Sequence, residues 1–159
     1  MSAGLSHSFH VVSADEHVPA ARRETRNVLA AWGVDAEVAA TACLIVTELV
    51  TNVVRHAARY SPTARVVLRA DQGELTIAVA DDHPFRPRAL PAPHDSGGWG
   101  LALVKGLVEE AQGSHQVAAD LDTGGKVIVI RLPLLPAPTA PAAPSAPPAL
   151  AAVRTAVPQ

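Results

Sequence analysis

Residues 36 to 58 form an apolar run with helical periodicity, interrupted by a carboxylate and an amide four residues apart, Glu48 and Asn52. Three further polar residues fall in the same narrow arc of the predicted helix: Thr41, Thr51 and Arg55. A carboxylate and an amide among apolar side chains are costly unless something pairs with them, so we expect this stripe to line a polar cavity that holds a ligand. The alternative is an amphipathic helix whose narrow polar face meets solvent.

The composition predicts one small domain with a hydrophobic core, because the chain has 159 residues, of which 48% are hydrophobic. The net charge of -2 and the scattered Lys and Arg residues argue against a nucleic-acid partner. A single cysteine, Cys43, excludes an internal disulfide and suits a reducing compartment. No run reaches membrane-spanning length without a charge or a proline, and the N-terminus lacks the pattern of a signal peptide. We therefore expect a cytoplasmic protein that does not contact a membrane.

The chain divides near Leu132 into a folded domain, residues 1–132, and a Pro/Ala-rich tail, residues 133–159. Proline at the density of the tail blocks both helix and strand, so we expect a polyproline-like or disordered segment. Such a tail is either a bare tether or a docking segment for a partner. The tether is favoured, because the tail lacks the recurring aromatic or charged residues that would anchor it to a partner.

The alternation of periods 2 and 3.6 predicts five strands and three helices in residues 1–132. Strands are expected at residues 8–13, 63–71, 74–81, 115–121 and 125–132. Helices are expected at residues 20–32, 36–58 and 99–112. Residues 82–98 hold four prolines and show no regular pattern, and a loop of this length in a small domain suggests a function.

Three local features carry chemistry: the Glu48/Asn52 helix, a strand that ends at Asp81, and the glycine turn at residues 97–100 that opens a helix. Glycine amides and a helix N-terminus suit phosphates, although a glycine cluster can also be a plain flexible loop. A carboxylate at the end of a strand can accept a hydrogen bond from an exocyclic amine such as that of adenine, or can simply form a turn. The amide of Asn52 supplies one oxygen for a hard cation, and Glu48 could orient a nucleophile.

In their order and spacing these residues resemble the GHKL ATPases, and the segment ELVTNVVRHA most resembles the bacterial anti-sigma-factor serine/threonine kinases. The resemblance implies an α/β fold, a two-layer sandwich of the Bergerat type with a mostly antiparallel sheet of about five strands packed by three helices. It implies Mg-ATP binding by Asn52, a general-base role for Glu48 and adenine binding by Asp81. The second glycine box of the family falls on Gly98, Gly100 and Leu101, implying contacts to the triphosphate, and residues 82–98 would form a lid.

Two positions depart from the pattern of the family. After Asp81 the family has glycine, whereas residues 82–85 read Asp-His-Pro-Phe, which is stiffer and bulkier beside the base. Many members also carry a threonine that assists adenine binding, two positions after a glycine, where this chain has Val127. Both departures weaken the expectation of ATP affinity more than the expectation of the fold.

The resemblance implies a regulatory protein kinase that transfers phosphate from Mg-ATP to an anti-anti-sigma protein of the STAS type. It further implies a sigma factor as second partner, a role in the regulation of transcription, and a homodimer as one oligomeric state. Arg86 or Arg88 could share the phosphate charge, although charges on a Pro-rich loop are usually solvated. The main alternative is a non-catalytic binding module with weak or no turnover. The catalytic half of a two-component histidine kinase is disfavoured because no helical hairpin with a phospho-accepting histidine precedes the domain.

Overall fold

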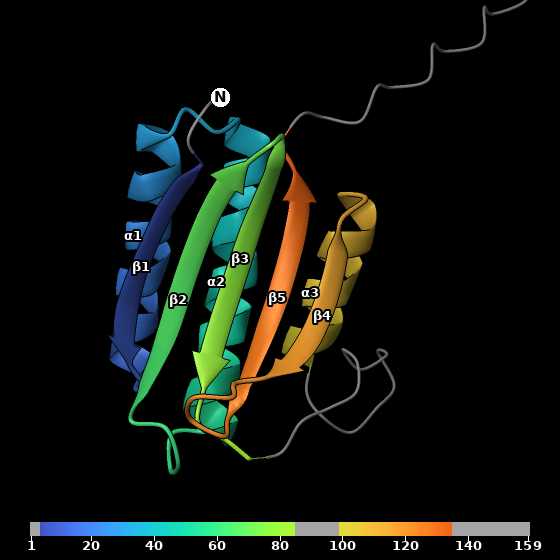
Figure 1. Cartoon of the computed structure of the whole chain (residues 1–159). Coiled ribbons are helices and arrows are strands. Elements are labelled where there is room, and N and C mark those ends of the chain that lie inside the picture. Colours follow the sequence, from blue (N-terminus) through green and yellow to red (C-terminus); the bar gives the residue numbers. More distant parts are fainter. Residues whose placement is uncertain (1–3, 85–98, 135–159) are drawn as a thin grey trace, which may run out of the picture.

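The computed structural model describes residues 4–84 and 99–134. Within these ranges the chain forms three α-helices, one short 3-10 helix and five strands (Figure 1). The helices are α1 (Val18–Ala31), α2 (Ala36–His56) and α3 (Trp99–Glu110), and the 3-10 helix spans Asp15–His17. The strands are β1 (Leu5–Val12), β2 (Thr63–Asp71), β3 (Glu74–Asp81), β4 (Ser114–Ala119) and β5 (Lys126–Pro133).

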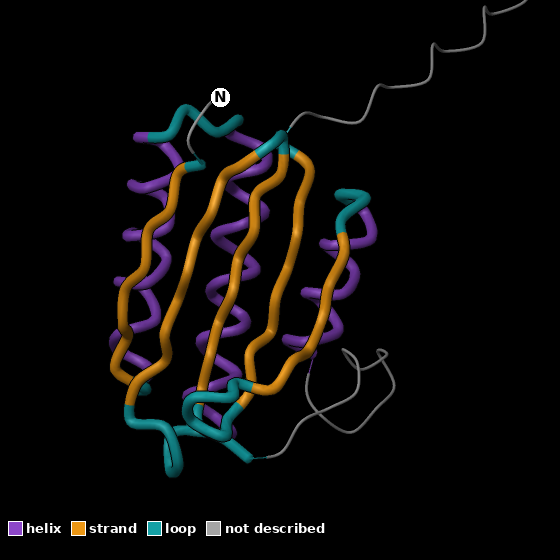
Figure 2. The backbone as a smooth tube through the Cα atoms, in the orientation of Figure 1, coloured by secondary structure: helices purple, strands orange, loops and turns teal. Residues whose placement is uncertain are grey.

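The five strands form one antiparallel sheet in the order β1-β2-β3-β5-β4. All three α-helices pack on the same face of this sheet, so the described part of the chain has two layers (Figure 2). The predicted fold class, a two-layer α/β sandwich with five strands and three helices, is confirmed.

The β2–β3 hairpin has the bounds that the sequence predicts. Its two turn residues, Gln72 and Gly73, have φ angles of 50° and 78°, as the favoured two-residue hairpin turns require. The turn sets the register Asp71↔Glu74, which directs the alternating apolar residues of both strands toward the helices.

Elsewhere the boundaries shift by a few residues. The first strand begins at Leu5 rather than at residue 8, because β1 pairs with β2 along its whole length, from Leu5↔Ala70 to Val12↔Thr63. The 3-10 turn was not predicted, since no apolar periodicity marks so short an element. Most of the predicted loop, from residue 85 to residue 98, and the tail after Leu134 lie outside the described residues.

Helix α2 lies at the centre of the helical layer (Figure 1). Its N-cap is Asp35, whose Oδ1 accepts hydrogen bonds from Glu37 N at 2.9 Å and Val38 N at 3.5 Å. Seven of its 21 residues are buried: Ala42, Cys43, Ile45, Val46, Leu49, Val50 and Val53. By length and composition alone α2 would also suit a membrane span, but here its apolar residues form part of the core under the sheet.

The core on the sheet side contains an inward row, which we define as the four cross-strand pairs of β3 and β5 that face the helices. Three pairs are apolar and the fourth is charged: Leu75↔Leu132, Ile77↔Ile130, Val79↔Ile128 and Asp81↔Lys126. All eight residues are buried. The row therefore changes from apolar to ionic at the end of the sheet where β3 ends and β5 begins.

Candidate functional site

One end of the molecule gathers the residues that the sequence singles out. Helix α2 ends there, β3 ends there at Asp81, and α3 begins there at Trp99 (Figure 1). Glu48 and Asn52 are half-buried and lie one turn apart on α2, so their side chains share one side of the helix.

Glu48 lies directly against the first turn of α3. A Cβ atom added to Gly100 would lie 2.7 Å from Glu48 Oε2, which is closer than real Cβ contacts allow. Glycine at this position therefore lets the carboxylate approach the N-terminus of a helix, where backbone N–H groups lack partners within the helix. Among the described residues, the side chains of Glu48 and Asn52 have no hydrogen-bond or ion-pair partner, so both remain available to a ligand.

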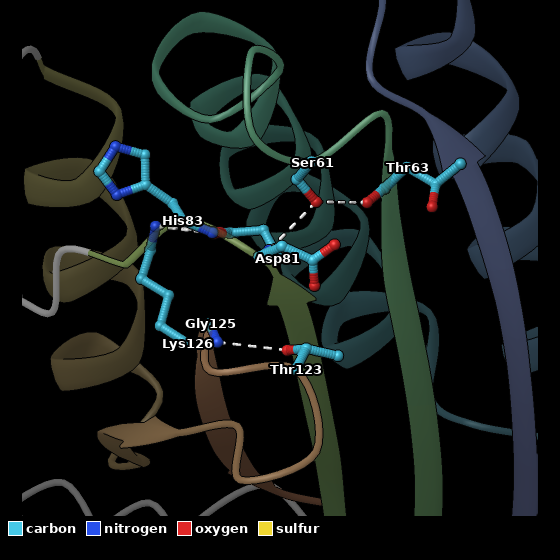
Figure 3. A network of polar contacts seen from close by, with 8 residues as sticks. Ser61, Thr63, Asp81, His83, Thr123, Gly125 and Lys126 are labelled. Atoms are coloured by element: carbon cyan, nitrogen blue, oxygen red, sulfur yellow. Dashed lines mark hydrogen bonds and ion pairs between the residues drawn. The ribbon is translucent and has the colours of Figure 1, made fainter.

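Asp81 is the last residue of β3 and is 4% exposed. Its Oδ1 accepts a hydrogen bond from His83 N at 2.8 Å. Lys126 Nζ donates a hydrogen bond to Oδ1 at 3.1 Å and forms an ion pair with Oδ2 at 3.0 Å (Figure 3). The carboxylate at the predicted adenine position is thus the partner of a buried ammonium.

The register of β5 brings Lys126 beside Asp81. Gly124, in the preceding turn, has a φ of +74°, and the main chain of Gly125 packs against the end of β3. A Cβ atom at Gly125 would collide with the carbonyl oxygen of Asp81 and lie 2.6 Å from Asp82 Cα. Glycine therefore allows β5 to begin tightly against β3, and the next residue, Lys126, faces the helices at the level of Asp81.

The chain segment after α2 is tied to the end of β3. Ser61 Oγ donates to the carbonyl oxygen of Thr63 at 2.7 Å and accepts from Asp82 N at 3.1 Å (Figure 3). The rings of Tyr60 and His83 meet edge to face, with centroids 4.9 Å apart. These contacts hold the end of β3, and with it Asp81, at a fixed position relative to the end of α2.

The remaining predicted residues belong to the second glycine box. Gly98 lies outside the described residues, as do Arg86 and Arg88. Gly100 is the second residue of α3. The side chain of Leu101 packs against the hydrophobic core, so this residue can offer only its backbone to a phosphate group.

The position of Val127 corrects one expectation. Val127 pairs with Ala80, and alternation along β5 puts its side chain on the sheet face that the helices leave open. The side chain of Asp81 is on the opposite face, toward the helices. The residue that stands beside Asp81 is Lys126, which sequence reasoning overlooked. The available signal was the period of two in KVIVIRLP, which groups Lys126 with the inward residues Ile128, Ile130 and Leu132.

The site suits a cation that brings most of its own ligands. Within residues 4–84 and 99–134, no group of three or more His, Cys, Asp and Glu side chains could hold a metal ion. Asn52 offers one amide oxygen that has no partner in the described part of the chain. Mg²⁺ bound to phosphates needs only one or two protein oxygens besides water, so the residues present fit a magnesium–nucleotide complex better than an ion held by protein alone.

A separate cleft of about 300 Å³ lies at the other end of α2, between the start of that helix, the end of α3 and the end of β5. Thr41, which shares the arc of Glu48 on α2, lines this cleft. The polar stripe therefore runs along the helix into two different regions, and Thr41 does not belong with Glu48 and Asn52.

The family model described as the histidine kinase-like ATPase domain matches residues 11–132. A search of curated proteins finds no match. Among solved structures, that of the RsbU and RsbW domains of Rv1364c from Mycobacterium tuberculosis is similar, with a TM-score of 0.55 and 19% identity over 81% of this chain. This similarity shows a shared fold. This chain spans 32% of that mycobacterial chain. The SiaB-SiaC complex from Pseudomonas aeruginosa matches with a TM-score of 0.49 and 14% identity, covering 79% of this chain and 88% of that one.

Proposed function

The chain belongs to the histidine kinase-like ATPase domain family, and from this premise we propose that it binds Mg-ATP and transfers the terminal phosphoryl group to a serine or threonine of a partner protein. The observation that carries the proposal is the meeting of Glu48 with Gly100 at the start of α3. This contact puts a carboxylate without a partner among the described residues beside a helix N-terminus, where a phosphate would bind.

Each residue has a distinct role in this proposal. Asp81 accepts a hydrogen bond from the exocyclic amine of adenine, and Asn52 gives one oxygen to Mg²⁺. When bound, the ion neutralises charge on the phosphate oxygens. Backbone amides of Gly98, Gly100 and Leu101 hold the phosphates, and Glu48 accepts the proton of the attacking hydroxyl group.

We propose an anti-anti-sigma protein of the STAS type as the phosphate acceptor and a sigma factor as the second partner. The support is the resemblance of residues 47–57 to the anti-sigma-factor kinases, together with the fold shared with the RsbU and RsbW domains of the mycobacterial protein. A homodimer in the cytoplasm, acting on transcription, completes the proposal. The single cysteine, Cys43, is buried and free, which suits a reducing compartment.

The kinase proposal is tested with purified protein, radiolabelled ATP, Mg²⁺ and candidate STAS proteins. We expect Glu48→Ala to slow phosphoryl transfer by about 10²- to 10⁴-fold while ATP binding, measured by calorimetry, persists. Asn52→Ala should lose the magnesium-dependent part of ATP binding as well. Glu37→Ala, an exposed position in the first turn of the same helix, is the matched control and should transfer at the normal rate. Transfer at full rate in both site variants would remove the assignment.

A non-catalytic binding module is the second candidate, and one observation favours it. The carboxylate of Asp81 already pairs with Lys126 and with His83 N, which leaves less acceptor capacity for a base. Titration of ATP by calorimetry decides between the two. Tight, magnesium-dependent binding that Asp81→Asn abolishes would exclude a scaffold that does not use nucleotide, whereas absence of heat and of transfer would support it.

A further inference from the structure

We infer that Lys126 is a second base-recognising residue: with Asp81 it forms a donor–acceptor pair that reads an adenine by two adjacent atoms, the exocyclic amine and a neighbouring ring nitrogen. This inference rests on the proposed nucleotide site, and it assigns to that site a residue that is distinct from Glu48, Asn52 and the glycine box.

The pair of Lys126 and Asp81 has an unused donor on the ammonium group and an unused acceptor on the carboxylate beside it. An ammonium group has three donors, and within the described part of the chain the recorded partners of Lys126 Nζ are the two oxygens of Asp81. A carboxylate can accept about four hydrogen bonds. Asp81 accepts two on Oδ1, one from His83 N and one from Lys126 Nζ, while its Oδ2 lies 3.0 Å from Nζ in an ion pair. The unfilled donor and the unfilled acceptor are therefore on directly neighbouring groups.

The burial of the pair makes these unfilled positions informative. The side chains of Lys126 and Asp81 are 7% and 2% exposed, so bulk water reaches them poorly. Buried polar groups normally have at least one hydrogen-bond partner, and each of these two groups meets that minimum through the other. The remaining donor and acceptor positions are therefore capacity that a ligand can use. A ligand that supplies one N–H and one lone pair at the spacing of neighbouring atoms would satisfy both.

Adenine has this pattern. Its exocyclic amine is a donor, and the ring nitrogens N1 and N7 lie on either side of the amine as acceptors. With the amine on Asp81, the ammonium of Lys126 can donate to whichever ring nitrogen faces β5. Both groups are attached to adjacent strands in fixed register, so the pair is preorganised for an edge of this shape rather than formed around it.

The test compares ATP with two analogues that each lack one ring nitrogen and keep the amine, 1-deaza-ATP and 7-deaza-ATP. For the wild-type protein we expect one analogue to bind about ten- to a hundredfold more weakly than ATP, as for the loss of a hydrogen bond to a charged group. In Lys126→Met the same analogue should bind as well as ATP does, because the donor is gone. Lys126→Arg, which keeps donors and charge, should retain part of the discrimination.

Lys105→Met is the matched control, since Lys105 lies on α3 and pairs with Glu109 at 3.7 Å; it should discriminate as the wild type does. Circular dichroism reports whether Lys126→Met folds, and if it does not, the wild-type analogue series decides alone. Equal binding of ATP and both analogues by the wild type would overturn the inference while leaving the nucleotide site intact. Tighter ATP binding by Lys126→Met would also overturn it, because Lys126 would then compete with the base. Absence of any nucleotide binding would overturn the proposed function together with this inference.

Discussion

The inward row of β3 and β5 contains apolar pairs and one ionic pair within the same two strands. Ile77↔Ile130 and Asp81↔Lys126 belong to the same two strands, keep the same register and face the same helices. All four residues are buried to 93% or more. The difference between them is therefore a difference of side-chain chemistry and not of backbone geometry.

The two pairs differ in what their burial contributes to the stability of the fold. Burying two isoleucine side chains is favourable by itself, whereas burying a carboxylate and an ammonium has a desolvation cost that their attraction barely offsets. An apolar fourth pair would have served the fold at least as well. The ionic pair lies at the end of the sheet where α2 ends and α3 begins, which is where the proposed nucleotide site lies, and the proposal gives the pair a role in ligand recognition.

The largest expected effect comes from breaking the ionic pair on one side only. Lys126→Met leaves a buried carboxylate without its counter-ion, and we expect the free energy of unfolding to fall by about 3–5 kcal/mol. Urea denaturation followed by circular dichroism measures the change. The double variant Asp81→Leu/Lys126→Met should recover most of the lost stability and bind no ATP. A double variant as unstable as the single one would show that the charges are needed for folding.

Truncating the apolar pair tests the other side of the comparison. Ile77→Ala should lower the free energy of unfolding by about 2–5 kcal/mol through lost burial and a cavity. ATP affinity, measured by calorimetry under conditions where the variant is folded, should stay unchanged. Thr76→Ala, on the opposite face of the same strand, serves as the control and should change stability by less than about 0.5 kcal/mol. A fall in ATP affinity for Ile77→Ala would contradict this prediction, because it would show that the apolar pair also affects ATP binding.

The close approach of β5 to β3 can be disturbed without changing either charge. Gly125→Ala introduces a Cβ atom against the carbonyl of Asp81, and we expect a loss of about 1–3 kcal/mol, typical of overpacking, together with weaker ATP binding. Gly106→Ala is the matched control, because a Cβ atom there meets nothing within 4 Å. Within α3 this control should stabilise the protein by about 0.5–1 kcal/mol. Normal ATP affinity in Gly125→Ala would show that the exact placement of Lys126 is unimportant.

The smallest effect concerns an ionisable group in the apolar region, Cys43. Burial of Cys43 raises the pKa of its thiol above the ordinary value of 9.0, against smaller opposing effects of Arg26 and Arg22. Because the folded-state pKa is higher, the stabilising contribution is complete below pH 9 and is lost as pH rises through the folded pKa. The free energy of unfolding of the wild type should thus fall relative to that of Cys43→Ala as the pH rises above about 9. Urea denaturation at each pH measures this difference, and a difference in the free energy of unfolding that does not change with pH would contradict the prediction.

Much of the fold could be predicted because its signals are local. Strict alternation in residues 63–71 and 74–81, with Gln72-Gly73 between them, predicts the hairpin at its observed bounds. The apolar period of α2 likewise predicts that helix from the sequence. For the site, the sequence singled out Glu48 and Asn52 as polar groups in an apolar helix and Asp81 as a carboxylate at the end of a strand. The structure places all three toward one end of the domain.

The amino-acid sequence by itself determined the elements, their apolar faces and the polar residues that those faces have to accommodate, because these properties depend on neighbours a few positions away. Only the tertiary structure decided which of those residues meet. Asp81 and Lys126 are 45 positions apart and pair through the register of two strands that are not consecutive in the chain. The contact of Glu48 with Gly100 depends on how closely α3 packs against α2, and packing distances between separate elements are not encoded in any local pattern.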